Sequence, residues 1–131
     1  MTTPSDSKLV IVDASGWVEY FSDGPKAESF ARYLDFPDHI LLPSIIVYEV
    51  HKKFSREQGK ILADNFISQA FAFGPRVIPL DLEISVLASR TSLETRLPMA
   101  DAIIYATAQH YNAKLVTSDA HFADFPGVIF V

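Results

Sequence analysis

Four acidic residues stand at positions where a carboxylate needs an explanation: Asp13, Glu49, Asp101 and Asp119. Asp13 directly follows the apolar run KLVIV, and Asp119 comes shortly after the run KLVT. Asp101 interrupts an almost uncharged stretch, and Glu49 has apolar neighbours on its helical face. Because carboxylates are rarely buried without partners, we expect the four side chains to converge on one cluster.

A divalent cation would explain such a cluster. Carboxylates packed together raise one another's pKa, and a bound cation would remove the cost of their repulsion. Ligand sets made only of oxygen atoms favour Mg²⁺ or Mn²⁺ over zinc. These ions serve in-line displacement at phosphorus, because they lower the pKa of the attacking water and neutralise the developing negative charge.

Strands alternate with helices along the chain that must position these acids. Strands are predicted at 8–12, 39–42, 76–80, 114–117 and 128–131, and helices are predicted to end near 22, 34, 55, 73, 96 and 112. Ser15, Ser44 and Asp81 are the predicted helix caps. The alternation indicates an α/β three-layer sandwich with a mainly parallel central sheet of four to five strands flanked by helices. Ligands of open parallel sheets bind beyond the carboxyl ends of strands, which is where Asp13 and Asp119 stand.

The segment 97–119 is the centre of this arrangement, because it joins a buried helix to a strand and carries one acid near each end. Pro98 suits the first helical turn, where its missing N–H costs nothing. The residues that follow are apolar or small on nearly every side, which is typical of a buried helix. Asn112 can end that helix in the left-handed conformation.

Length and composition limit the class of protein. The 131 residues fit a single domain at 8–131, preceded by a disordered lead-in at 1–7. The sequence has no cysteine, which excludes disulfides and thiolate zinc sites and fits a cytoplasmic location. The net charge of −5 counts against a passive nucleic-acid binder. No apolar run is long enough to predict a membrane span.

The ordered set of motifs resembles the PIN domain, a metal-dependent ribonuclease fold, and most closely the VapC toxins of bacterial toxin–antitoxin pairs. The matching segments are VDAS at 12–15, SIIVYEV at 44–50, MADAIIYATA at 99–108 and LVTSD at 115–119. No single motif is specific, whereas their order over nearly the whole chain is. The resemblance implies four catalytic, metal-binding acids and two supporting hydroxyls: Asp13, Glu49, Asp101 and Asp119, with Ser15 and Thr117.

The resemblance also implies an activity and partners. The protein would be a metal-dependent endoribonuclease, the toxin of a type II VapBC pair, in which a metal-activated water hydrolyses RNA phosphodiesters with Mg²⁺ or Mn²⁺. Its products would carry 5′-phosphate and 3′-hydroxyl ends. The expected partners are the RNA substrate, a second copy of the chain and a small antitoxin that covers the site, and no membrane is expected.

Each feature has a simpler interpretation. Asp13 could be only a helix cap, Asp119 a turn residue, Glu49 a solvent-reaching side chain and Asp101 a complement to its helix dipole. The histidines show no metal-ligand spacing, and surface or core roles are expected for all of them: His39, His51, His110 and His121. A basic run follows Glu49 and could contact phosphate or simply face solvent: Lys52, Lys53, Arg56 and Lys60.

Two alternative functions belong to other classes. A receiver-type signalling domain also has parallel strands and an acidic Mg²⁺ pocket, with Asp81 as its phosphoacceptor. It would need paired acids after the first strand, whereas Asp13 stands between Val12 and Ala14. It would also need a lysine closing the last strand, whereas the chain ends VIFV, and it would leave Glu49 and Asp101 unexplained. The other alternative is a catalytically silent PIN scaffold that binds a partner, and the intact set of acids argues against it.

Overall fold

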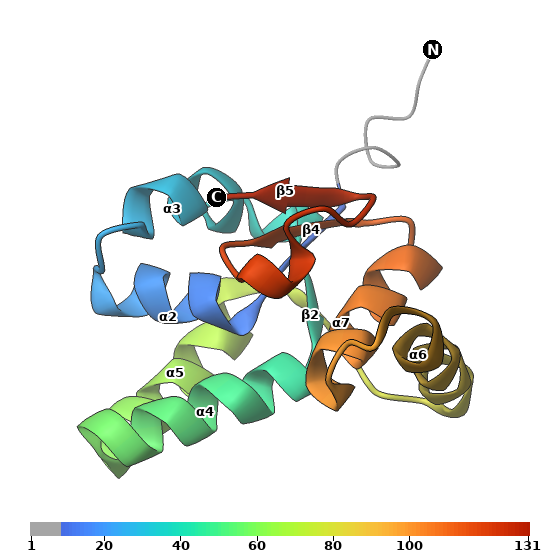
Figure 1. Ribbon diagram of the computed structural model, residues 1–131. Helices are drawn as coiled ribbons and strands as arrows, with labels where there is room; N and C mark the ends of the chain where they lie inside the picture. The colour runs from blue at the N-terminus through green and yellow to red at the C-terminus, as the bar shows by residue number, and fades with distance from the viewer. Residues whose placement is uncertain (1–8) are drawn as a thin grey trace.

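A computed structural model of the chain describes residues 9–131, apart from the side chains of residues 70, 71 and 73 (Figure 1). The predicted lead-in at 1–7 lies outside these residues. The strands are β1 (Val10–Val12), β2 (Leu41–Pro43), β3 (Arg76–Ile78), β4 (Lys114–Thr117) and β5 (Val128–Phe130). The helices are α2 (Ala14–Ser22), α3 (Ala27–Leu34), α4 (Ser44–Gln58), α5 (Lys60–Phe73), α6 (Leu82–Thr95) and α7 (Met99–His110), with short 3₁₀ turns η1 (Pro37–His39) and η2 (Ala120–Phe122).

All strand pairs in the described chain are parallel. Hydrogen bonds define a three-stranded sheet in the order β1-β4-β5 and a two-stranded sheet of β2 and β3. An isolated parallel bridge between Val10 and Ile40 joins the two sheets. The register places Ile11 opposite Leu115, so the carboxyl ends of β1 and β4 lie side by side. The predicted α/β fold with a parallel sheet flanked by helices is confirmed.

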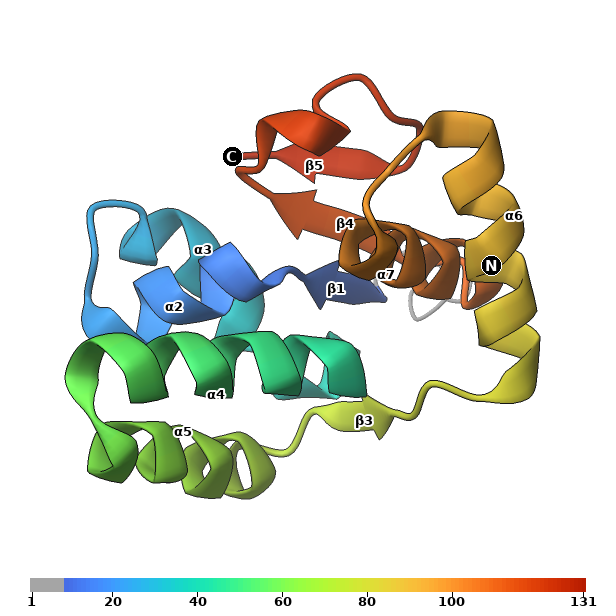
Figure 2. The ribbon, with the colours of Figure 1, turned by 60° about the horizontal axis from the view of Figure 1, so that its bottom comes forward.

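The helices cover the sheet in pairs, as Figure 2 shows. The α4–α5 pair packs against α2, which in turn packs against α3, and α6 and α7 pack together on the other side of the strands. The strands β1 and β2 are fully buried, which explains why their sequences are apolar without alternation. The main core includes Trp17, Phe30 and Phe66 and continues across the sheet to Tyr105 and Phe122.

Several predicted boundaries shift, each for a local reason. The helix after β1 begins two residues earlier than predicted, because Asp13, not Ser15, caps it by accepting a hydrogen bond from the backbone of Gly16. Ser44 is the first residue of α4 rather than its cap. The strand predicted at 39–42 begins later, because Pro37 starts a 3₁₀ turn that includes His39. The strand predicted at 76–80 ends at Ile78, before a proline that has no backbone N–H to donate.

Within residues 9–131, no helix combines the length and the apolar character needed to cross a membrane.

Candidate metal centre

Asp13 is the most tightly held acid of the cluster. It leaves the carboxyl end of β1, where its backbone N–H donates to the Val116 carbonyl of the adjacent strand over 3.1 Å. Its residue is only 5% exposed. The Oδ1 atom accepts from the Ser15 hydroxyl at 2.7 Å and from the Gly16 backbone, and Oδ2 accepts from the Thr117 hydroxyl. The two hydroxyl residues predicted to support the acids therefore both contact Asp13.

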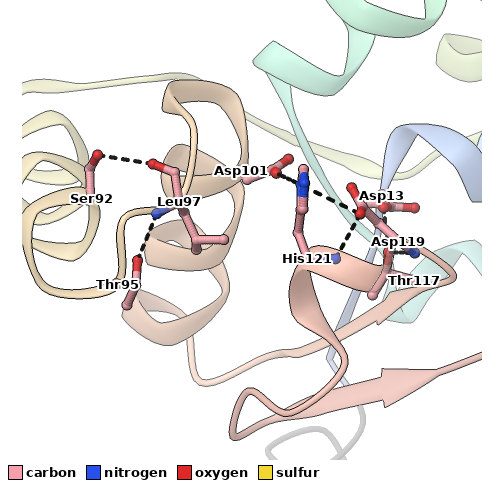
Figure 3. Close-up of polar contacts among 8 residues, drawn as sticks. All are labelled: Asp13, Ser92, Thr95, Leu97, Asp101, Thr117, Asp119 and His121. Carbon is pink, nitrogen blue, oxygen red and sulfur yellow. Dashed lines mark hydrogen bonds and ion pairs between the residues drawn. The ribbon is translucent and has the colours of Figure 1, made fainter.

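The hydroxyl of Thr117 links Asp13 to Asp119, as Figure 3 shows. Thr117 is fully buried at the end of β4. Its Oγ1 donates to Asp13 and accepts the backbone N–H of Asp119 at 2.9 Å. Asp119 then caps η2, because its Oδ1 accepts the backbone N–H of His121 at 2.9 Å. The parallel pairing of β1 with β4 is thus what brings the two acids together.

Asp101 reaches the cluster from the first turn of α7, whose start is fixed by the turn that follows α6 (Figure 3). In this turn, the Ser92 hydroxyl donates to the Leu97 carbonyl at 3.0 Å, and the Leu97 N–H donates to the Thr95 hydroxyl at 3.2 Å. Leu97 is buried and anchors the turn. The side chain of Asp101 is 17% exposed, so it faces the cluster and remains accessible from solvent.

His121 completes the closest group of donors. Its Nδ1 lies 2.8 Å from Oδ2 of Asp101 and 3.5 Å from Oδ1 of Asp119. One ligand atom from each of these three residues lies within 4.8 Å of the other two. His121 is on the surface, as predicted, but its place in the site was not predicted from the sequence. The signal available was its position two residues after Asp119, a spacing that fits a short turn folding back on the acid.

Glu49 approaches from the middle of α4, between the buried Ile46 and Val50. Its pKa is raised, first by burial and then by the charges of Asp101, Asp13 and Asp119. Glu49 is therefore near enough for the charges of all three acids to influence its pKa. Neither Glu49 nor Asp13 belongs to the closest donor group.

The electrostatics of the cluster fit a divalent cation. Burial is the largest influence on Asp13 and raises its pKa, while its three hydrogen bonds oppose that shift and the charge of Asp119 adds to it. The pKa of His121 is also raised, first by its hydrogen bond with Asp101 and then by the nearby charges of Asp119 and Asp101. The shift of His121 and the smaller effect of Asp119 on Asp13 both reflect negative charge gathered in one place. Carboxylate oxygens supplied by four segments are a suitable donor set for Mg²⁺ or Mn²⁺.

Two of the other histidines and three residues of the basic run have local partners. His51 contacts Asp64 at 3.1 Å, and His110 lies 3.8 Å from Glu83. Lys53 and Arg56 share Glu57, at 3.1 and 3.7 Å. Lys52 lies over the ring of Tyr48, which directly precedes Glu49 in the sequence.

Comparison with known families decides the fold family. The PIN domain family matches residues 10–128, which is almost the whole chain. The chain belongs to the PIN domain family. This assignment replaces the receiver-type alternative, because a different family accounts for the same strands and acids. No curated protein sequence matches the chain.

Solved structures agree with the family assignment. A toxin–antitoxin complex from Klebsiella pneumoniae matches with a TM-score of 0.75 and 23% identity, over 92% of this chain and 95% of the other. VapBC2 from Rickettsia felis, bound to a DNA fragment from its promoter, matches with a TM-score of 0.74 and 18% identity, over 94% and 97%. VapC20 from Mycobacterium tuberculosis, described as a sarcin–ricin loop cleaving toxin, matches with 0.76 and 16%, over 91% and 96%. At these identities the similarity shows the fold, which is the PIN fold seen in VapC-type toxins.

Proposed function

We propose that the protein is a metal-dependent endoribonuclease and the toxin of a VapBC-type toxin–antitoxin pair. The observation that carries this proposal is the convergence of acids from four segments of a PIN fold. Asp13 and Asp119 come from adjacent strand ends, Asp101 from α7 and Glu49 from α4. A purely structural role explains one capping acid but not a fourth carboxylate, Glu49, whose pKa is raised by the charges of the other three as well as by burial.

In this proposal the acids hold one or two divalent cations. Asp13, Glu49, Asp101 and Asp119 would bind Mg²⁺ or Mn²⁺. The bound ion would lower the pKa of an attacking water and neutralise charge on the phosphoryl oxygens. Ser15 and Thr117 fix the orientation of the Asp13 carboxylate through their hydrogen bonds, so that its position does not depend on the ion.

The reaction proposed is hydrolysis of an RNA phosphodiester. Water adds to phosphorus in line with the bond to the 3′ oxygen, that bond breaks, and the 3′ oxygen leaves as a hydroxyl while phosphate stays on the 5′ side. Lys52 is the cation nearest in sequence to Glu49 that is not ion-paired with Glu57. It is therefore the residue of the basic run that best suits a phosphate contact next to the acids.

The partners proposed are an antitoxin and a second copy of the chain. The fold is shared with the toxin–antitoxin complexes of Klebsiella pneumoniae and Rickettsia felis, which supports an antitoxin partner. Large apolar side chains are exposed along α6 and at the start of α7, with Leu82 82%, Leu93 83% and Met99 74% exposed. Such a face suits burial against another copy. With RNA and an antitoxin as partners, we expect the protein to act in the cytoplasm.

A paired growth and cleavage experiment tests the proposed activity. We expect expression of the wild-type chain without an antitoxin to arrest growth, and the purified protein to cleave RNA with Mg²⁺ or Mn²⁺ and stop with a chelator. Asp13→Asn and Asp119→Asn keep the shape of the capping groups while removing a negative ligand. Each should abolish arrest and cleavage, and the double variant should be about as inactive as either single one, because the ligands act as a unit.

The control is Asp124→Asn, which neutralises an exposed acid outside the donor group and should leave arrest intact. Circular dichroism would confirm that every variant is folded. Arrest by the double variant at wild-type strength would refute the nuclease proposal and favour the silent scaffold that only binds a partner.

A further inference from the structure

We infer that His121 supplies an imidazole nitrogen to the metal held by Asp101 and Asp119, so that the centre is a mixed nitrogen–oxygen site. This inference rests on the proposed metal-dependent function and adds a donor that the set of four acids does not include. Its basis is the closest donor group in the described part of the chain, which contains His121 and two acids rather than acids alone.

Two of the three donor separations are close to the edge length of a metal coordination polyhedron. In an octahedral site with ligand bonds of about 2.1 Å, neighbouring donors lie about 3 Å apart. Nδ1 of His121 lies 2.8 Å from Oδ2 of Asp101 and 3.5 Å from Oδ1 of Asp119. An ion among these atoms would take the place of the hydrogen that Nδ1 and Oδ2 now share. No large rearrangement of the three residues is needed to form such a site.

Packing under His121 holds the imidazole in this position. The next residue, Phe122, is fully buried and stacks on Tyr105, with ring centroids 6.2 Å apart. Tyr105 lies one helical turn after Asp101 on α7, and its hydroxyl donates to the Pro126 carbonyl at 2.7 Å. The turn carrying His121 is therefore fixed against the helix carrying Asp101. A metal ligand binds more effectively when packing already holds it in position. The packing of Phe122 on Tyr105 provides this for His121.

Accessibility and chemistry also fit a ligand role. The His121 side chain is 59% exposed and that of Asp119 is 35% exposed, so an ion can reach the three donors directly from solvent. An imidazole nitrogen favours first-row transition ions, whereas Mg²⁺ prefers carboxylate, carbonyl and water oxygens. We therefore expect this site to favour Co²⁺ over Mg²⁺ more strongly than a site of carboxylates alone would.

Pulsed electron paramagnetic resonance of bound Mn²⁺ tests the inference without relying on activity. Wild-type protein loaded with Mn²⁺ should show nitrogen-14 modulation from a coordinated imidazole, and His121→Ala should lose it. Competition titrations with Co²⁺ and Mg²⁺ give a second readout. His121→Ala should weaken Co²⁺ binding by roughly tenfold or more and Mg²⁺ binding much less.

The matched control is His51→Ala, which removes a surface histidine paired with an aspartate at 3.1 Å outside the site. It should keep both the nitrogen signal and the metal affinities, and melting curves would confirm that both variants are folded. Asp101→Asn identifies the site by weakening Mn²⁺ binding. Mn²⁺ binding that depends on Asp101 but shows no nitrogen modulation would overturn the role of His121 alone, whereas no Mn²⁺ binding by wild type would also overturn the proposed function.

Discussion

Replacing Asp101 by asparagine separates two effects of the acidic cluster: the repulsion between its carboxylates in the metal-free protein, and its binding of metal. The donor oxygens of Asp101 and Asp119 lie within 4.8 Å of each other. Two unit charges at that distance repel by about 1 kcal/mol in water and about 3.5 kcal/mol at the effective dielectric of a protein surface. Because the side chains are 17% and 35% exposed, the lower part of this range applies. Asp101→Asn should thus leave the metal-free protein equally stable or up to about 2 kcal/mol more stable. The lost ion pair with the exposed His121 offsets only part of that gain.

The same substitution should sharply reduce stabilisation by metal. At a Mn²⁺ concentration of about 100 times its dissociation constant, binding stabilises the native state by about 2.7 kcal/mol. For a chain of 131 residues, this raises the melting temperature by about 10 °C. If loss of the Asp101 charge weakens binding roughly 100-fold, the stabilisation falls to about 0.4 kcal/mol, and the shift falls to about 2 °C.

Thermal melts of wild type and Asp101→Asn, each with chelator and with Mn²⁺, measure both quantities. Asp64→Asn is the matched control, because Asp64 also pairs with a histidine on the surface but lies outside the donor group. The control should keep the full metal-induced shift. An unchanged shift in Asp101→Asn would refute Asp101 as a ligand, and a large loss of stability in its metal-free form would refute the repulsion argument.

Two further predictions concern pH and the buried hydroxyl. The pKa values of Asp13 and Glu49 are raised above their ordinary values of 3.8 and 4.5. The stability that their protonated forms contribute is therefore complete below those values and is lost as pH rises through the raised pKa values. Urea unfolding of the metal-free protein should show this loss as the pH rises above about 4, and an equally steep loss in Glu49→Gln would contradict the assignment to Glu49. Thr117→Val leaves Asp13 without one hydrogen-bond donor and the Asp119 N–H without an acceptor. The free energy of unfolding should therefore fall by about 1–3 kcal/mol relative to Thr117→Ser. Equal urea midpoints for the two variants would count against this link.

Much of the fold could be predicted because its signals are local. The run KLVIV and the uncharged face of α7 are apolar without alternation, which only a buried strand or helix requires. The exact starts of helices were harder to predict, because neighbouring residues can be equally good caps in sequence. Asp13 and Ser15 are both good capping residues, and the choice depends on β4, whose Thr117 holds Asp13 in place from a distant part of the chain. Likewise, the place where the two sheets meet depends on a single bridge at Val10 that no local pattern encodes.

The candidate site was predictable only where chemistry was unusual. Asp101 is the one charge in an otherwise uncharged helix, and Glu49 lies between buried apolar residues, so each carboxylate is expected to have a partner. His121 gave no such signal, because an exposed histidine after a strand is ordinary. Its relation to Asp101 is created by Phe122 packing on Tyr105, a contact between residues on different elements. Spacing along the chain places His121 near Asp119, whereas only tertiary packing brings it to Asp101.

Backbone geometry explains how the fold can tolerate so much negative charge. Asp13 caps α2, Asp101 lies in the first turn of α7 and Asp119 caps η2, so three of the acids stand where helical N–H groups point outward. Backbone amides at these positions favour negative charge. Glu49 has no such compensation, because it lies in the interior of α4. Its raised pKa, caused by burial and then by the other three acids, is the result. A bound cation would thus relieve Glu49 of a repulsion that its helix does not offset, whereas at Asp13, whose pKa is also raised by burial, hydrogen bonds already oppose the shift.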